Sequence, residues 1–191
     1  MPIASLKSLL LLASATVAIV SGCSRAPMQP SELHEGVDAD KALVNFVRTS
    51  IFFGDGVNFT IWDGRKIVGT LNAGHIIQYE TEPGEHIFMC RTESWTYMKA
   101  VLKPGHEYFV KPFSYPGLWV ARFGLRPENA NVSKRIDGWL KKLSPEALDA
   151  EAATEYLQST MPLVEEAIEE YENGEVTYTE LPADFGRPWT K

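Results

Sequence analysis

The sequence predicts a mainly β fold, an antiparallel β-sandwich followed by a C-terminal α-helical extension. Between residues 41 and 126, short runs rich in branched and aromatic side chains recur about every ten residues, separated by turn sequences. After residue 127, apolar residues recur at the spacing of a helix instead. The composition of the 191 residues, 45% hydrophobic and 23% charged, is that of a globular protein with one domain and an appendage.

Residues 1–22 have the organisation of a secretion signal. Lys7 is the only charged side chain in this stretch, and residues 9–20 are almost wholly apolar. This apolar segment is shorter than the roughly 20 residues that a membrane-spanning helix needs. A cleaved signal peptide is therefore expected.

The signal ends in Val20-Ser21-Gly22-Cys23, which resembles a bacterial lipobox. The resemblance implies that Cys23 receives a diacylglycerol thioether, that the chain is cut before it, and that the new amine is acylated, for example with palmitate. Several acyl chains hold a protein firmly on a membrane. In enteric-type sorting, Ser24 in place of Asp implies the outer membrane, facing the periplasm. The alternative interpretation is an ordinary signal peptide with a chance cysteine.

Residues 23–40 are expected to form a flexible tether after the lipidated cysteine, because they are polar and contain Pro27 and Pro30. The sequence has two cysteines, so lipidation of Cys23 leaves Cys90 as the only thiol and excludes an intramolecular disulfide. Cys90 follows an apolar run, which predicts a buried, unreactive side chain.

The β-sandwich domain is expected over residues 41–126. Asp-Gly, Pro-Gly and Asn-Ala-Gly sequences divide this region into short runs, and such sequences are turn signals. In the second run, Val57, Phe59 and Ile61 share one face of the expected strand. The expected strands cover residues 42–48, 57–62, 66–71, 75–80, 85–91, 96–102, 106–113 and 118–125.

The helical extension is expected over residues 127–174. Apolar residues from Val132 to Leu143 fall on one helical face, and Ser144-Pro145 predicts the N-cap and first residue of a second helix. Pro162 is expected to break or kink that helix, which should end at Asn173-Gly174. Residues 175–191 contain two prolines and a glycine and predict an extended tail.

Several elements of the β region match a known pattern. They are a first strand that ends in Arg48, the run over residues 62–71 with its Asp63-Gly64 turn, Pro83-Gly84-Glu85-His86, and residues 104–110. These elements resemble an uncharacterised family of bacterial lipoproteins with one domain of unknown function. They also look like PEGA-type β-domains of envelope proteins. The resemblance covers residues 41–126 and implies a small β-sandwich without assigned catalytic residues.

Charge and motif spacing argue against several functions. The net charge of −7 disfavours nucleic-acid binding, which relies on contacts with phosphates. His75, His86 and His106 each follow a turn glycine closely, but their spacing is not that of a zinc site. The sequence has no G-x-S-x-G elbow and no phosphate-binding loop. No metal, no cofactor and no enzymatic activity are therefore expected.

Two candidate binding surfaces remain. The first consists of loop aromatics whose rings could bind a small ligand or glycan, or could instead pack against the C-terminal helices. The second lies in residues 144–174, which carry nine carboxylates and no Lys or Arg, and is either an acidic docking surface or a solvated face. The aromatic candidates are Trp95, Tyr115 and Trp119, and the acidic candidates are Glu165, Glu166, Glu169 and Glu170.

The predicted function is that of a membrane-anchored bacterial lipoprotein acting as a non-catalytic binding or scaffolding module of the cell envelope. Its expected partners are the membrane, through the lipid anchor, and an envelope protein. The alternative is a small-ligand or glycan-binding β-domain that uses the loop aromatics.

Overall fold

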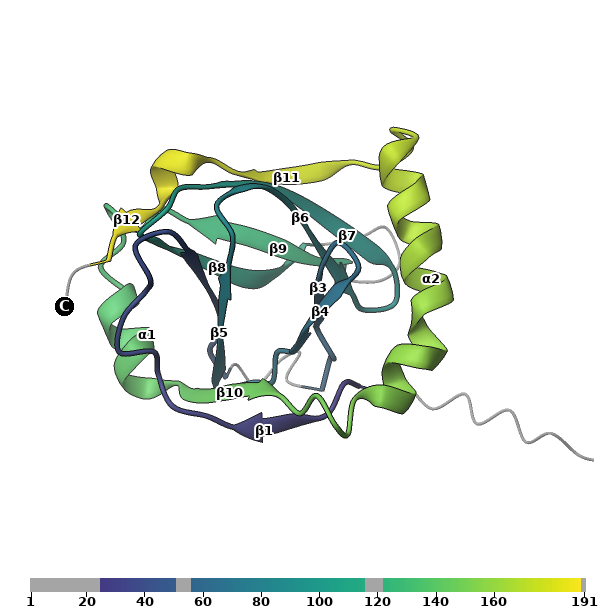
Figure 1. The fold of residues 1–191 in the computed structure, drawn as a ribbon, viewed down its shortest axis with the longest axis horizontal. Helices are drawn as coiled ribbons and strands as arrows, with labels where there is room; N and C mark the ends of the chain where they lie inside the picture. Colours follow the sequence, from purple (N-terminus) through teal and green to yellow (C-terminus); the bar gives the residue numbers. More distant parts are fainter. Residues whose placement is uncertain (1–24, 51–55, 116–121, 190–191) are drawn as a thin grey trace, which may run out of the picture.

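The computed structural model of the protein describes residues 25–50, 56–115 and 122–189. Two β-sheets pack face to face as a sandwich (Figure 1). The helix α2 (Thr154–Glu172) covers the outer face of one sheet, and the short α1 (Ile136–Lys142) packs on the other. The predicted sandwich with a C-terminal helix is confirmed. The sheets are mixed, however, and not purely antiparallel.

The first sheet has seven strands in the order β1-β10-β5-β2-β8-β12, with β9 also paired to β8. Two of its pairings, β2 with β8 and β10 with β5, are parallel. Its strands are β1 (Met28–Pro30), β2 (Ala42–Arg48), β5 (His75–Thr81), β8 (His106–Tyr115), β9 (Arg122–Glu128), β10 (Ser144–Leu148) and β12 (Arg187–Pro188).

The second sheet has five strands in the order β11-β7-β6-β3-β4. Only the edge strand β11 runs parallel to its neighbour, and the other pairings are antiparallel. Its strands are β3 (Thr60–Asp63), β4 (Lys66–Thr70), β6 (Gly84–Arg91), β7 (Trp95–Leu102) and β11 (Tyr178–Leu181).

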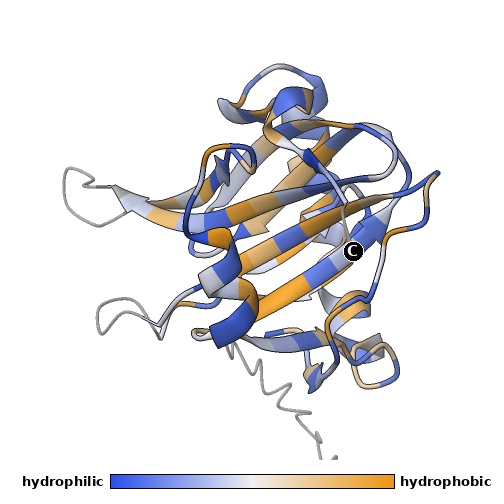
Figure 2. Cartoon of the chain, turned by 90° about the vertical axis from the view of Figure 1, so that its left-hand side faces the viewer, coloured by the Kyte–Doolittle hydropathy of each residue, from blue (hydrophilic) through white to orange (hydrophobic). Residues whose placement is uncertain are grey.

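The main hydrophobic core lies between the two sheets. Alternate residues of β2, including Val44 and Phe46, point into it, while Val47 belongs to the smaller core under α1. The ring of Phe46 meets that of Phe88 on β6 edge to face, with 5.3 Å between their centroids. Apolar and polar residues alternate along several strands, as the banded colouring in Figure 2 shows. This alternation is the pattern from which the sandwich was predicted.

The predicted flexible tether over residues 23–40 is wrong for part of its length. Ala26 is 1% exposed, and β1 pairs with β10 so that Met28 lies opposite Leu148. The backbone N–H of Thr70 donates to the Met28 sulfur at 3.2 Å. At Gly69 an added Cβ would lie 2.8 Å from the Met28 methyl, so the absence of a side chain there makes room for β1. The pairing was missed because its partner strand lies far along the chain.

The second helix does not begin at Ser144-Pro145, as predicted, because these residues start β10. A residue that precedes proline favours extended backbone, so the same dipeptide suits a strand equally well. The helix α2 begins after Ala153 and is not broken at Pro162. Proline leaves the carbonyl four residues earlier without its helical donor, but Gln158 is exposed, so water can supply one.

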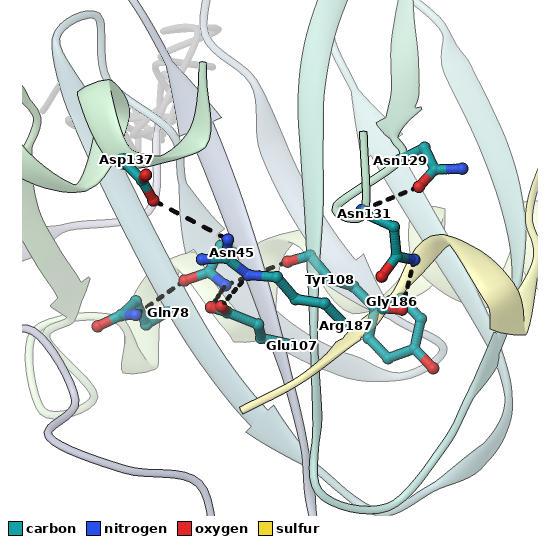
Figure 3. Close-up of polar contacts among 9 residues, drawn as sticks. All are labelled: Asn45, Gln78, Glu107, Tyr108, Asn129, Asn131, Asp137, Gly186 and Arg187. Carbon is teal, nitrogen blue, oxygen red and sulfur yellow. Dashed lines mark hydrogen bonds and ion pairs between the residues drawn. The ribbon is translucent and has the colours of Figure 1, made fainter. Parts of the chain in front are cut away.

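The predicted extended tail folds back onto both sheets. It supplies β11 to the second sheet and β12 to the first, with a short 3₁₀ turn (Ala183–Phe185) between them. Asn131 fastens this turn by donating from its amide to the carbonyl of Gly186 at 3.0 Å (Figure 3).

A buried carboxylate holds the end of the tail. Arg187 donates from Nε to Glu107 at 2.6 Å, and Asn45 donates to the other oxygen of Glu107 at 3.3 Å (Figure 3). Gln78 in turn donates to Asn45 at 2.8 Å. The side chain of Glu107 is only 4% exposed. Burial raises its pKa, and the charge of Arg187 opposes that rise.

Replacement of Arg187 with alanine should destabilise the fold. It leaves the buried Glu107 carboxylate without its cation, which should lower the free energy of unfolding by about 2–3 kcal/mol, a modest value because Arg187 is itself partly exposed. Urea unfolding measures the change. Adding Glu107→Gln to Arg187→Ala should restore part of it, because the amide is neutral.

Lys99→Ala is the matched control for this substitution. Lys99 forms an ion pair with Glu85 at 3.3 Å, but the Glu85 side chain is 72% exposed, whereas that of Glu107 is 4% exposed. Loss of this pair should change the free energy of unfolding much less than Arg187→Ala does, because a carboxylate in water keeps its hydration when the cation is removed. Equal losses for the Arg187 and Lys99 variants would show that the Glu107 pair does not hold the tail.

Candidate functional site

A cleft of about 620 Å³ lies where β7, β9 and β11 approach the C-terminal end of α2. Five aromatic residues contribute to its walls, together with the carboxylate of Glu170 and several hydroxyl-bearing residues. The aromatic residues are Trp95, Tyr97, Phe113, Phe123 and Tyr178, and the hydroxyl-bearing residues other than tyrosines are Ser94, Thr96, Thr177 and Thr179. We call this hollow the aromatic cleft.

Strand geometry aligns the rings of the cleft. Trp95 and Tyr97 are two residues apart on β7 and therefore share one face of the sheet. The parallel register of β11 sets Tyr178 directly beside Tyr97. Tyr171 of α2 lies against both tyrosines, with 5.9 Å between its ring centroid and each of theirs. Tyr97 is thus held by neighbours on several sides, whereas Tyr178, which is 48% exposed, contacts Tyr171 and leaves part of its ring open to the solvent.

Glu170 brings a carboxylate to the aromatic cleft. The hydroxyl of Tyr97 lies 3.2 Å from Oε2 of Glu170 and 3.1 Å from the carbonyl of Ala167, so its proton is shared between them. Burial, together with the charge of Glu170, raises the pKa of Tyr97 and keeps this hydroxyl protonated. Oε1 of Glu170 has no hydrogen-bond partner among the described residues, which leaves one acceptor available to a ligand.

The predicted aromatic residues are only partly brought together. Trp95 is half-buried in the wall of the aromatic cleft, with the guanidinium carbon of Arg91 5.7 Å from its ring centroid. Its ring also packs against the core beneath α2, so Trp95 fits both alternatives drawn from the sequence. Tyr115 ends β8, but its side chain and the whole of Trp119 lie outside the described residues.

The four predicted glutamates do not form one surface. Glu165 makes a two-pronged contact with Arg65 of the β3–β4 turn, at 2.8 to 3.0 Å. Glu170 lines the aromatic cleft. Only Glu166 and Glu169 are exposed on the outside of α2. The four positions span an arc of about 140° around the helix, with Glu166 and Glu169 in its middle and Glu165 and Glu170 at its two edges, where they meet other parts of the fold.

Sequence reasoning missed Tyr97 and Tyr178 as members of the site. The position of Tyr97 could have been predicted, because it lies two residues after Trp95 in an expected strand and therefore on the same face. That of Tyr178 could not, because its place beside Tyr97 depends on the parallel pairing of the tail with β7.

His86 forms a second polar centre at the β3–β4 turn, beside a pocket of about 290 Å³. Its Nδ1 lies 2.9 Å from Asp63, and its Nε2 lies 2.9 Å from the carbonyl of Glu82. Tyr79 also donates to Asp63, at 3.0 Å. Both partners of the ring are acceptors, so the doubly protonated imidazolium suits the site. The hydrogen bond to Asp63 raises the pKa of His86, although burial opposes it.

The other side chains that could take part in binding or catalysis are occupied by structural contacts or buried. Arg48 donates to the carbonyls of Val57 and Leu71, each at 2.8 Å. Cys90 is fully buried, as predicted, and burial raises the pKa of its thiol to about 12. Within the described ranges, no three His, Cys, Asp or Glu side chains are placed to hold a metal ion.

The fold and its cleft define a mixed β-sandwich with a preformed concave site built from aromatic and acidic residues. Comparisons with models of protein families, with curated proteins and with solved structures find no match. Among the described residues, no helix is both long and apolar enough to cross a membrane.

The His86–Asp63 pair should make stability depend on pH. Because the pKa of folded His86 is raised, its contribution is fully present below the unfolded value of about 6.5 and is lost as the pH rises through the folded value. The free energy of unfolding of the native protein should therefore fall across this window. Urea unfolding between about pH 6 and pH 9 measures the fall.

His86→Gln should flatten this part of the pH profile, since an amide does not titrate. His106→Gln is the matched control, because it makes the same substitution at a ring that bonds the backbone carbonyl of Pro104 instead of a carboxylate. A His86→Gln variant whose stability still falls like that of the native protein would assign the pH dependence to another group.

Proposed function

We propose that this chain is a membrane-anchored bacterial lipoprotein whose folded part is a non-catalytic binding module of the cell envelope, with the aromatic cleft as its ligand site. One observation carries the proposal. Trp95 and Glu170, which the sequence assigns to two separate candidate surfaces, line the same cleft. A volume of about 620 Å³ lies within the usual range of small-ligand sites.

The residues of the cleft favour a ligand with both flat apolar faces and hydroxyl groups. The rings of Trp95 and Tyr178 offer aromatic surface, and Oε1 of Glu170 can accept from a hydroxyl or amide donor. Ser94 and Thr177 add groups that both donate and accept. A sugar ring has this combination of surfaces, so an envelope glycan is the proposed ligand.

A scaffolding role remains the second candidate. Glu166 and Glu169 are exposed on α2, and Leu163 on the same helix is 37% exposed. A basic envelope protein could contact this surface, with an association that weakens as salt is raised. Cross-linking in cells tests it: Glu166→Lys with Glu169→Lys should abolish recovery of the partner, and unchanged recovery would exclude this surface.

Substitutions in the aromatic cleft should weaken glycan binding. Glu170→Gln should lower the affinity about tenfold or more, because a hydrogen bond to a charged group contributes about 1.5–3 kcal/mol. Trp95→Ala should weaken binding by removing the aromatic wall. Isothermal titration calorimetry with soluble oligosaccharides of N-acetylated amino sugars, prepared from the envelope, measures both effects.

Glu166→Gln is the matched control for this titration. It makes the same chemical change on the exposed side of the same helix and should leave the affinity unaltered. If the native protein binds none of these oligosaccharides, or if all three variants bind them equally well, the cleft is not a glycan site.

Lipidation of Cys23 is tested separately. Cells supplied with a palmitate analogue should label the native protein and retain it in the membrane fraction, whereas Cys23→Ala should be unlabelled. Cys90→Ala, which changes a buried thiol, should be labelled as the native protein is. Equal labelling and membrane retention of Cys23→Ala would overturn the anchor.

A further inference from the structure

We propose that β1 holds the folded body directly on the bilayer surface, with the aromatic cleft at the end of α2 that is remote from the membrane. The inference rests on the proposed lipidation of Cys23. It deepens the proposed function, because it states where the cleft stands relative to the lipid surface.

The N-terminal segment is part of the fold from Ala26 onward. Ala26 belongs to the core beneath α2, together with Trp62 and Tyr156. The carbonyl of Pro27 accepts from the backbone N–H of Asp149 at 3.1 Å, and β1 follows with three paired residues on β10. At the other end of β1, the N–H of Ser31 donates to the carbonyl of Pro145 at 3.1 Å.

This docking leaves almost no free tether. Only three Cα–Cα steps separate Cys23 from Ala26, so the two Cα atoms lie within about 11 Å of each other in any conformation. A free chain over residues 23–40 could instead extend to about 60 Å. By pairing with β10, β1 therefore removes most of the reach that the sequence alone would allow.

The helix α2 gives the direction from the anchor to the cleft. Tyr156, in its first turn, shares a core with Ala26, whereas Glu170 lies in its last turn. At about 1.5 Å per residue, these two positions are about 21 Å apart along the helix axis. Figure 1 shows β1 near the start of α2 and β11 at its opposite end. The bilayer therefore meets the end of the body that does not carry the cleft.

The charge at the anchored end indicates the kind of lipid surface that fits it. Glu151 and Glu155 are exposed near the start of β1, together with the cation Arg25. Because carboxylates outnumber cations here, anionic lipids would not attract this part of the surface, and the acyl chains must supply the attachment to the membrane. The surface that suits this end is a zwitterionic bilayer.

Energy transfer from a labelled side chain to an acceptor lipid tests the orientation. The lipidated full chain is placed in phosphatidylcholine vesicles with a dye at Glu151→Cys or at Glu175→Cys, both exposed positions. Cys90 is buried with a raised pKa and should take no label, which the parent protein verifies. Transfer from position 151 should exceed transfer from position 175 several-fold, because the helix between them spans about 27 Å.

A linker variant separates docking from anchoring. Twelve Gly and Ser residues inserted between Ser24 and Arg25 lengthen the reach and leave β1 paired. Transfer from position 151 should then fall, while glycan affinity stays the same. Replacing part of the phosphatidylcholine with an anionic lipid should not increase transfer in the native chain.

Each outcome has a distinct meaning. Equal transfer from positions 151 and 175 in membrane-bound, fatty-acid-labelled protein would overturn the orientation and leave the proposed function standing. If energy transfer from position 151 does not change when the linker is inserted, the role of β1 is likewise overturned. Absence of fatty-acid labelling would overturn the anchor, and this proposal with it.

Discussion

The parallel pairing of β11 with β7 is the contact on which the aromatic cleft depends. It sets Tyr178 beside Tyr97 and covers a sheet edge whose backbone groups would otherwise be unpaired. Thr179 links this strand to the first sheet, since its hydroxyl lies 3.2 Å from the carbonyl of Leu125 on β9. Because β11 comes from the last part of the chain, the cleft is complete only when the tail has folded back.

Buried charges in this protein hold segments in place. Glu107 fastens the end of the tail through Arg187, and Asp63 joins the β3–β4 turn to β6 through His86. Each carboxylate has a cation and further donors around it, which offsets the cost of removing charge from water. The cleft differs from both centres, because Glu170 keeps an acceptor oxygen that no described residue occupies. This difference is why the cleft, and neither of the other two centres, is proposed as the ligand site.

The chemistry of the site was more predictable than its assembly. Trp95 stood out as an aromatic residue beside a turn, and Glu170 as a member of an acidic segment. Their proximity follows from the packing of α2 on the second sheet, where Tyr97 contacts both Ala167 and Glu170. The same packing places Glu165 in contact with Arg65, so the four glutamates do not form the single acidic surface that was expected.

The sequence by itself determined the sandwich class, most strand positions and a C-terminal helix, because alternating burial and turn residues act over a few neighbouring positions. The tertiary structure decided which strands pair and in which direction. Ser144-Pro145 is compatible with a helix start or a strand, and only β5 and β1 on either side make it a strand. Residues 28–30 were predicted to be part of a tether, and they form a strand because β10 pairs with them. Such choices depend on hydrogen-bond partners that lie far away in the chain, so no local pattern encodes them.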